Sequence, residues 1–506
     1  MKKLTDSLWL GAVLTGVLKF IAVCQFNFLF GLICYIPLFI AIQNATVKDS
    51  FKKGLISGLV FAAFAFYWMV AGAERFTGYS IIYGFIVFLI SAFLYALFCG
   101  ITLACFTLAE NKKKKYSFII NSILAAAVFC IFEWLLMLAA QGFPWFASYS
   151  GNAFAANLYT VQPASFFGVH ILTFTVVLVN SLAASFIVQK QWKKLFIPVA
   201  VVIVYFGFGF LTLQQFDKQT SQSKPFTVAI LAENILPDIQ WDDKTGNELV
   251  ERLLKLNSDA AAQKPDVILW SESAVPWTYS RDDDFLKEVF KITASSNATH
   301  IMGINTEYQD NEVYNSVYCL LPNGDIAGRY DKQFLLSLIE KPVGGLLIPF
   351  FSSKGFYARN DTVHNAPLNT PYGKAGIMVC NESAVPEAAS NEANKGAEFF
   401  MNLSNDGWFN NTYIVDAHFY YARLRAVETR KDIAVNCNNG ISGLIQATGR
   451  IADQQRDSEP FVKMVNVQPN NYTTLATSNP LILIYCCALY VLFFVAIKVV
   501  QKFKRA

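Results

Sequence analysis

The chain has 506 residues, of which 54% are apolar and only 15% are charged, a composition too apolar for an ordinary soluble protein. Its net charge of +4 is too small to indicate a nucleic-acid-binding protein, and its basic residues form short clusters beside apolar runs. The composition therefore favours a membrane protein and excludes nucleic acid as a partner.

Long apolar runs occupy the chain before about residue 214 and again after about residue 479. A helix needs about 20 apolar residues to cross a bilayer, because every backbone polar group in lipid must be bonded within its own segment. We predict about eight such spans, near residues 7–24, 26–43, 54–72, 80–109, 117–139, 161–188, 195–213 and 479–499. The spans at 80–109 and 161–188 are long enough to tilt strongly or to project beyond the bilayer.

Basic residues collect in alternate loops between these spans. The clusters are Lys2 and Lys3; Lys48, Lys52 and Lys53; Lys112 to Lys115; Lys190, Lys193 and Lys194; and Lys498, Lys502, Lys504 and Arg505. Because cytoplasmic loops carry the excess of Lys and Arg, both termini are predicted to be cytoplasmic. The segment 215–478 and the aromatic loop 142–146 are then extracytoplasmic.

Three parts follow from this pattern: a seven-helix transmembrane domain (1–214), a water-exposed domain (215–478), and a last transmembrane helix with a cytoplasmic tail (479–506). Within the second part, short β-rich runs alternate with helical stretches, which is typical of an α/β layered domain. The expected strands are Phe226–Ala232, Asp266–Ser271, His300–Asn305, Val313–Leu321, Ala375–Cys380, Glu398–Leu403 and Ile433–Asn438, with a turn at 321–324. The expected helices are 245–263, 283–297 and 413–430.

Polar residues that could carry chemistry follow three of these strands. Cys380 stands where an apolar run meets polar residues, which suits a nucleophile, although a half-buried structural cysteine fits the same position. Glu272 could be a general base, or a carboxylate at a helix N-terminus. Lys332 could stabilise an oxyanion, or be an ordinary surface lysine. Position alone leaves these alternatives open.

The ten cysteines show no CxxC pair, no metal-ligand spacing with the four histidines and no regular framework. Most of them fall inside apolar runs, where cysteine packs as a small apolar side chain. The sequence therefore supports neither a zinc site nor a disulfide scaffold, and we expect no metal and no cofactor.

Glu272, Lys332 and Cys380, in that order and each at a strand end, resemble the Glu-Lys-Cys triad of the nitrilase (carbon–nitrogen hydrolase) superfamily. Over nearly its whole length the chain resembles a membrane branch of that superfamily, the bacterial apolipoprotein N-acyltransferases. The residues that carry this resemblance are Glu133-Trp134, Gly142-Phe143-Pro144-Trp145, Trp241, Trp270-Ser271-Glu272, Tyr330-Asp331-Lys332, Glu340, Cys380-Asn381-Glu382, Ser404-Asn405-Asp406-Gly407-Trp408-Phe409, His418, Arg425-Ala426-Val427-Glu428 and Asn439-Gly440-Ile441-Ser442.

The resemblance implies an αββα sandwich for the water-exposed domain and a periplasmic site on the bacterial inner membrane. It implies acyl transfer in two steps through a Cys380 thioester, with Glu272 as general base and Lys332 stabilising the oxyanion. The implied donor is a phospholipid, and we expect phosphatidylethanolamine. The implied acceptor is the diacylglyceryl-cysteine of an apolipoprotein. We expect the enzyme to be a monomer.

Further residues gain expected roles from the same resemblance. Glu340 and Glu382 would hold the triad or bind the acceptor amine. Trp241, Trp408 and Phe409 would line the acyl path, although interfacial anchoring or core packing would explain each of them as well. The chain departs from the family at Asn381, where an aromatic residue is usual, and at Leu338-Ile339, where Phe-Gly is usual.

Two alternatives remain at this stage. A membrane-tethered amidase or nitrilase would pass the acyl group to water, but a single span would suffice to tether it. A transporter with an inactive enzyme-like domain would need paired broken helices and intramembrane charges, and the sequence shows few of these.

Overall fold

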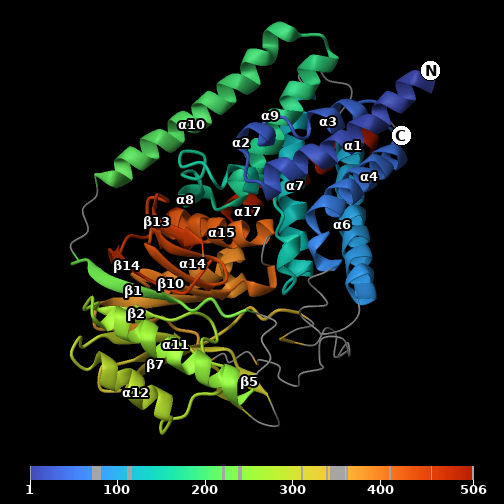
Figure 1. Ribbon diagram of the computed structural model, residues 1–506. Helices are drawn as coiled ribbons and strands as arrows, with labels where there is room; N and C mark the ends of the chain where they lie inside the picture. The colour runs from blue at the N-terminus through green and yellow to red at the C-terminus, as the bar shows by residue number, and fades with distance from the viewer. Residues whose placement is uncertain are drawn as a thin grey trace.

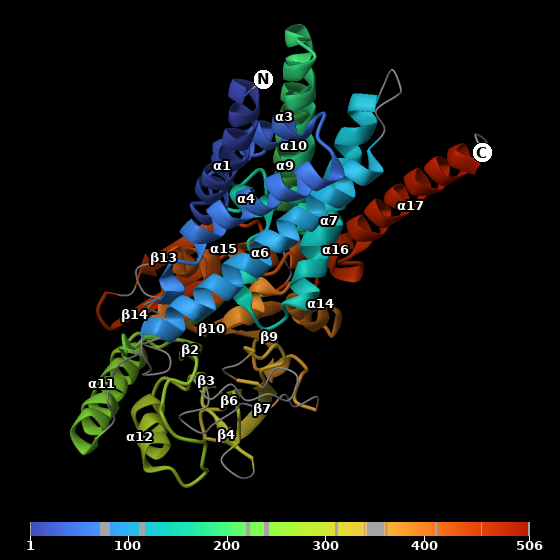
Figure 2. The same ribbon diagram turned by 90° about the vertical axis from the view of Figure 1, so that its right-hand side faces the viewer.

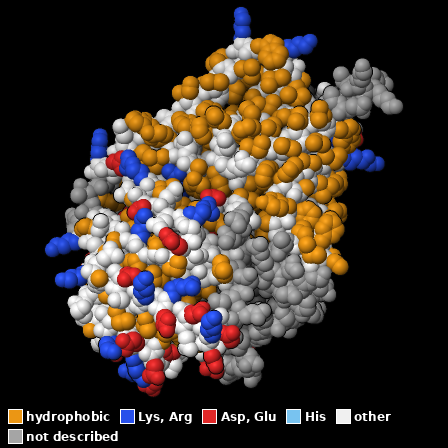
Figure 3. Space-filling view, viewed as in Figure 1, with side chains coloured by type: hydrophobic (Ala, Val, Ile, Leu, Met, Phe, Trp, Pro, Cys, Tyr) orange, Lys and Arg blue, Asp and Glu red, His pale blue; other side chains and the backbone are white. Residues whose placement is uncertain are grey.

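The computed structural model describes residues 2–70, 81–110, 117–218, 223–236, 242–308, 312–337, 340–341, 359, 363–409, 412–456 and 458–503. Helices form one end of the molecule and two stacked sheets form the other, as Figures 1 and 2 show from two sides. Hydrophobic side chains cover the helical end in the space-filling view, whereas Lys, Arg, Asp and Glu gather over the sheets (Figure 3). The two ends therefore present surfaces suited to two different solvents.

The helical end contains long and short helices. They are α1 (Lys2–Cys24), α2 (Phe28–Gly31), α3 (Ile36–Ile42), α4 (Val47–Ala65), α6 (Ile81–Ala109), α7 (Ser117–Ala139), α8 (Ala164–Phe167), α9 (His170–Val188), α10 (Phe196–Asp217) and, from the end of the chain, α17 (Ile482–Phe503). α4 packs against α1 and α6, and α7 packs against α9 and α17. α10 runs along one side and extends away from the bundle toward the sheets (Figure 1).

The prediction of eight membrane spans is confirmed only in part. Among the described residues, four helices are long and apolar enough to cross a membrane, at Gly84–Ala109, Phe118–Ala139, His170–Val188 and Trp192–Asp217. Shorter apolar helices cover Trp9–Cys24, Phe28–Ile42 and Ile482–Lys498. Three of the expected spans, at 26–43, 54–72 and 161–188, are not single helices. Within 54–72, α4 ends at Ala65, and residues 71 and 72 lie outside the described residues.

The segment expected as one span at 26–43 is broken between α2 and α3. Asn180, from the middle of α9, satisfies the backbone groups that this break exposes. Its Oδ1 accepts hydrogen bonds from the backbone N–H groups of Tyr35 (2.8 Å) and Ile36 (3.2 Å), and its Nδ2 donates to the carbonyl of Gly31 (2.8 Å). A break within an apolar segment is tolerated here because a protein side chain, in place of water, completes the backbone hydrogen bonds.

The long span expected at 161–188 is also wrong. Gly168 has φ of +72° and separates α8 from α9. A Cβ at this position would lie 2.8 Å from the carbonyl oxygen of Pro480, so both the backbone angle and the close approach favour glycine. α9 is therefore a helix of ordinary spanning length.

Two six-stranded sheets make up the other end. The first has the order β14-β1-β2-β3-β6-β7 and the second has the order β13-β12-β11-β10-β9-β8. The first contains β1 (Phe226–Ala232), β2 (Val267–Leu269), β3 (Thr299–Gly303), β6 (Ser316–Leu320), β7 (Ile326–Asp331) and β14 (Phe461–Val467). The second contains β8 (Leu368–Thr370), β9 (Gly373–Val379), β10 (Phe399–Asn405), β11 (Ile433–Asn438), β12 (Ile441–Ile445) and β13 (Ile451–Arg456), and a separate short pair is β4 (Thr306–Glu307) with β5 (Val313–Tyr314).

The sheets stack face to face with helices on their outer faces. Along β1, Val228 and Ile230 belong to the core between the sheets, whereas Ala229 and Leu231 pack under α11 (Asp243–Ala261) and α12 (Asp284–Thr293). The second sheet is covered by α14 (Pro386–Asn394) and α15 (Tyr413–Thr429), whose buried residues share one core with the helical end. This period-two alternation gives the expected αββα sandwich.

The seven predicted strands are present, with one correction. The run expected as a single strand at 313–321 is divided into β5 and β6, and Asn315 occupies the interruption. The turn expected at 321–324 connects β6 to β7, with Gly324 at φ of +84°. The edge strands β8, β13 and β14 were not predicted; most of their side chains are exposed or only partly buried, apart from Leu368, Val465 and Val467.

Chain direction places three strand ends at one edge of the sandwich. β2 and β3 are parallel, and β7 regains their direction after the two antiparallel pairings β3–β6 and β6–β7. β9 runs parallel to β10 in the other sheet. Glu272 follows β2, Lys332 follows β7 and Cys380 follows β9.

The end of β3 approaches the Glu272 backbone so closely that only glycine fits there. A Cβ on Gly303 would fall on the carbonyl oxygen of Ser271 and 2.9 Å from the Glu272 Cα atom. We expect Gly303→Ala to lower the free energy of unfolding by about 1–3 kcal/mol, as overpacking does. Thermal unfolding of the detergent-solubilised protein measures this.

Gly246→Ala is the matched control, because nothing lies within 4 Å of a Cβ at that helical position. It should raise stability by about 0.5–1 kcal/mol through helix propensity. Equal unfolding temperatures for the two variants would contradict the packing described for Gly303.

Candidate active site

Lys332 lies at the centre of a buried cluster of charges at this edge. Its side chain is fully buried, and its Nζ lies 3.0 Å from Glu340 Oε1 and 3.4 Å from Glu272 Oε1. The surface-lysine alternative is therefore wrong. A buried ammonium needs such partners, because an unpaired charge taken out of water is costly.

Asn315 connects the two carboxylates from the other side. Its side-chain Nδ2 donates to Glu272 Oε1 (2.8 Å) and to Glu340 Oε1 (3.2 Å). Its backbone carbonyl accepts from the Lys332 backbone N–H (2.9 Å). The other Glu340 oxygen accepts from the backbone N–H of Leu336 (2.7 Å). The interruption between β5 and β6 therefore fixes the relative positions of Glu272, Lys332 and Glu340.

Cys380 begins a short turn, η4 (Cys380–Ala384), directly after β9. Its backbone has φ of +53°, a left-handed conformation that is uncommon for residues other than glycine. Its side chain is 5% exposed, and Glu272 and Lys332 are the charged groups that act on it most strongly. A strained residue at a strand end is a frequent property of functional sites.

The charges in this cluster shift one another's pKa values. Burial raises the pKa of the Cys380 thiol well above its usual range; Glu272 raises it further and Lys332 opposes both. Burial also raises the pKa of Glu272, against the charge of Lys332. For Lys332, burial lowers the pKa, but Glu340, Glu272 and Cys380 together outweigh burial and the net shift is upward. The site therefore holds a thiol and an ammonium at neutral pH, so Cys380 needs a base to become a nucleophile.

Glu382 joins the Cys380 turn to the segment that follows Lys332. Its carboxylate accepts hydrogen bonds from the backbone N–H groups of Gln333 (2.7 Å), Phe334 (3.0 Å) and Val379 (2.8 Å), and from the Tyr330 hydroxyl (3.1 Å). Burial raises its pKa to about 7 against these donors. Glu382 therefore holds two parts of the site together and does not face an open space.

Asn381 lies on the side of the site that faces the helical end. Its Nδ2 donates to the carbonyl of Phe334 (2.9 Å). Both residues line a cavity of about 140 Å³ whose other walls come from the end of α7, the loop 140–147, and Ala384, Val385 and Glu387. The same loop is tied to the Lys332 segment, because the Ser337 backbone N–H donates to the carbonyl of Gly142 (2.9 Å). The aromatic loop of the helical end thus forms part of the site's surroundings.

The three aromatic residues expected along an acyl path have different outcomes. Trp241 lies outside the described residues, and the side chain of Trp408 is not described. Leu338 and Ile339, where the chain departs from the family, also lie outside the described residues. Phe409 is buried, and its ring packs edge-on against Trp68 (5.2 Å between centroids) and His418 (5.6 Å). Phe409 therefore belongs to the core shared by the two ends of the molecule.

Sequence reasoning missed several residues of the site. Asn315 acts through a contact with Glu272, 43 positions away in the chain. Tyr330 was noted as part of a motif, but its hydrogen bond to Glu382, 52 positions away, was not anticipated. His418 and Asp406 were noted as part of a motif, but their pairing (Nδ1 to Oδ1, 2.7 Å) was not anticipated. The polar interruption of an otherwise apolar β run was the only sequence signal for Asn315.

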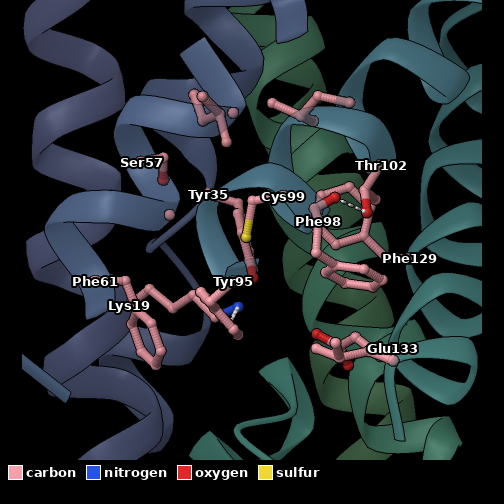
Figure 4. A pocket seen from close by; sticks show the side chains of 15 residues that line it. Lys19, Tyr35, Ser57, Phe61, Tyr95, Phe98, Cys99, Thr102, Phe129 and Glu133 are labelled. Carbon is pink, nitrogen blue, oxygen red and sulfur yellow. Dashed lines mark hydrogen bonds between the residues drawn. The ribbon is translucent and has the colours of Figure 1, made fainter. Parts of the chain in front are cut away.

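A second buried polar cluster lies inside the helical end. Lys19 and Glu133 line a cavity of about 30 Å³ from different sides (Figure 4). Lys19 donates to the Tyr95 hydroxyl (2.7 Å), while Glu133 accepts from the Ser150 backbone N–H (2.9 Å) and the Thr173 hydroxyl (2.7 Å). Glu133 therefore faces the protein interior, as its position in an apolar helix requires. Neither this cluster nor any other among the described residues groups three or more His, Cys, Asp or Glu side chains suited to a metal ion.

Comparison with known proteins assigns the class of the two-sheet domain first. Residues 227–476 match the family model described as carbon-nitrogen hydrolase, so this domain is a member of that class. Residues 15–182 match a second model, the apolipoprotein N-acyltransferase N-terminal domain.

Curated relatives cover both regions at once. The apolipoprotein N-acyltransferase of Vibrio parahaemolyticus is 28% identical over 460 residues, which cover 86% of each chain. The enzymes of the same name from Geobacter metallireducens (25%, covering 83% of this chain and 81% of the relative) and Photobacterium profundum (26%, covering 86% and 85%) are similar over the same extent. The chain belongs to the apolipoprotein N-acyltransferase family, and it is an enzyme of the carbon–nitrogen hydrolase superfamily.

The hydrogen bonds of Glu272 predict how the pH profile of catalysis responds to its neighbours. A general base acts in its ionised form, and burial raises the pKa of Glu272 above the 4.5 usual for a glutamate. Activity should therefore fall at a pH above 4.5 as the solution is acidified. Asn315→Ala removes a donor that favours the ionised form, so the acid limb should move to higher pH. Glu340→Gln removes a negative charge that disfavours the ionised form of Glu272, so the acid limb of the pH profile should move to lower pH.

The pH dependence of kcat measures both shifts. Asn323→Ala, in the exposed β6–β7 turn, is the control and should leave the profile unchanged. Shifts of the two site variants in the same direction would exclude Glu272 as the titrating base.

Proposed function

We propose that this protein is an N-acyltransferase that acylates the N-terminal diacylglyceryl-cysteine of apolipoproteins, the last step of lipoprotein maturation. The acyl group would come from a phospholipid, with phosphatidylethanolamine as the donor, through a thioester on Cys380. One observation carries the proposal: Asn381, which directly follows Cys380, lines a cavity whose walls come largely from the helical end, next to the buried Glu272–Lys332–Glu340 cluster. Site and helices are thus built as one unit.

The first half-reaction follows from the protonation states of the site. Glu272 takes the proton from the Cys380 thiol, and the sulfur attacks the carbonyl carbon of the donor's acyl ester. The Lys332 ammonium stabilises the negative charge that develops on the carbonyl oxygen, a contribution commonly worth about 3–4 kcal/mol. The carbon–oxygen ester bond then breaks, Glu272 returns its proton to the leaving alkoxide, and a lysophospholipid leaves behind the Cys380 thioester.

The second half-reaction uses the same groups in the same order. The free α-amino group of the acceptor attacks the thioester carbonyl, and Glu272 accepts a proton from this amine. The carbon–sulfur bond breaks, the amide forms, and the proton returns to the Cys380 sulfur. Glu340 and Glu382 support this cycle by holding Lys332 and the Cys380 turn. No cofactor enters either step.

The membrane arrangement is part of the proposal. Both substrates carry acyl chains, and extracting such a chain from a bilayer costs about 0.8 kcal/mol per methylene group. We propose that residues 1–214 and 479–506 hold the enzyme in the bacterial inner membrane, with both termini cytoplasmic. Residues 215–478 then form a periplasmic catalytic domain, and the protein acts as a monomer. Trp241 and Trp408 retain their proposed role along the acyl path.

Two other functions account less well for the same features. A membrane-tethered amidase needs no contact between its site and the helices, whereas here the loop 140–147 borders the site. A transporter with an inactive domain does not require a buried lysine held between two carboxylates next to a strained cysteine. The arrangement favours an active transferase.

The thioester predicts a covalent intermediate on one particular cysteine. Purified protein incubated with acyl-labelled phosphatidylethanolamine should carry label that hydroxylamine releases, and Cys380→Ala should abolish the labelling. Cys437→Ala is the matched control, because Cys437 is also buried and lies in β11, two strands away from β9, which Cys380 follows. It should keep the label; labelling that survives Cys380→Ala would show that the assigned nucleophile is wrong.

A further inference from the structure

A third cavity, lined by none of the residues of the candidate active site, lies where α10 meets the sheet domain. It has a volume of about 260 Å³ and is lined by Ser165, Phe166, Thr212, Gln215, Phe216, Arg430, Tyr472, Thr473, Thr474 and Leu475. These residues come from α8, the end of α10, the end of α15 and the segment before α16 (Leu475–Ser478). None of them lines the cavity beside Asn381 or belongs to the charge cluster around Lys332.

Arg430 is the unusual residue of this cavity. It ends α15 in the left-handed conformation (φ +55°, ψ +45°), a position where glycine is normally favoured. Its side chain is 3% exposed. An arginine kept in a strained backbone position and buried there suggests a role for its guanidinium group.

The guanidinium group of Arg430 has protein contacts but no carboxylate partner. It donates to the carbonyl of Ala447 (3.2 Å) and to the Ser165 hydroxyl (3.1 Å), and it lies over the Phe216 ring (4.7 Å to the centroid). Within the described ranges, no Asp or Glu oxygen lies within 4.0 Å of it. Asp217, the acidic residue whose charge acts on Arg430, is already paired with Arg450 through two contacts of 2.6 Å.

This charge is costly without a counter-ion. Burial lowers the pKa of Arg430 to about 10, and Asp217 opposes that shift only in part. Arginine nevertheless stays charged at neutral pH, so the protein holds an incompletely compensated cation at the cavity wall. The planar guanidinium group matches phosphate geometry better than any other side chain.

The surroundings of the cavity combine polar and apolar groups in the order that a phospholipid presents them. The Ser165 hydroxyl accepts a hydrogen bond from Arg430, and Thr212 and Thr473 also line the cavity. Exposed apolar side chains continue outward from it, because Phe166 packs on Phe208 of α10 (5.5 Å between ring centroids) and both are more than one-third exposed. Only 17% of the apolar part of α10 is buried within the protein, so the rest of this helix needs an apolar environment.

We propose that this cavity binds the phosphate group of a membrane phospholipid through Arg430, with the acyl chains lying along α10 beside Phe166 and Phe208. This lipid is distinct from the acyl donor. It supplies the missing counter-charge and links α10 to the end of α15. The site does not depend on the proposed acyl transfer and would exist in an inactive variant.

Photo-crosslinking in the full-length Cys380→Ser variant tests the site without any contribution from acyl transfer. The probe is phosphatidylglycerol with a diazirine in one acyl chain. Label should appear on peptides that contain Phe166 and Phe208, and adding Arg430→Gly should lower the affinity at least about tenfold, as expected for lost hydrogen bonds to a charged group. Glycine suits the left-handed position, so this variant should still fold, and a cooperative thermal unfolding transition checks this.

Arg456→Gln is the matched control, because it removes an exposed arginine of the same domain that pairs with Asp416. Its labelling should equal that of the Cys380→Ser background. Equal labelling in the Arg430→Gly variant, or equal labelling by a diazirine diacylglycerol without phosphate, would overturn the proposal. Complete protection by inorganic phosphate would identify a site for a free anion and would overturn the lipid assignment.

Discussion

The pairing of one buried lysine with two carboxylates is the interaction on which the rest of the site depends. Lys332 lies between Glu340 at 3.0 Å and Glu272 at 3.4 Å, in a place that water does not reach. The ammonium keeps Glu272 able to ionise, and Glu340 keeps the ammonium in place. Without Lys332 two buried carboxylates would face each other, and without the carboxylates a charged lysine could not remain buried. The protonated thiol of Cys380 and its need for a base follow from the same balance.

The fold supplies this pairing through chain direction and through one carboxylate that acts as a structural link. β2, β7 and β9 deliver their carboxyl ends to one edge of the sandwich, so residues distant in sequence meet there. Glu382 then fixes the Cys380 turn to the segment after Lys332 through backbone donors on both sides. The loop 140–147 of the helical end lines a cavity together with Asn381, next to Cys380, so the helical end contributes directly to the surroundings of the site.

Much of this arrangement could be predicted from the sequence, because the signals were local. Apolar runs that end in polar residues located Glu272 and Cys380, and resemblance to a known triad added Lys332, which position alone gave no reason to choose. Asn315 and the break between α2 and α3 could not be predicted, because their partners lie far away in the chain: Glu272 for Asn315, and Asn180 for the backbone of Tyr35. The eight expected spans were too simple for the same reason, since an apolar run does not reveal where a distant side chain replaces a helical hydrogen bond. Arg430 gave no sequence signal, because its backbone conformation and burial appear only in the fold.

The central claim is that the site passes an acyl group from one lipid-borne substrate to another. The most direct measurement is a chase of the isolated, acyl-labelled enzyme with a synthetic diacylglyceryl-cysteine lipopeptide, followed by mass spectrometry of the peptide. We expect the label to leave the enzyme and appear as an amide on the peptide's α-amino group, while an N-acetylated peptide leaves the label on the enzyme. Release of the label as free fatty acid at the same rate with or without the lipopeptide would contradict acyl transfer and would indicate a hydrolase.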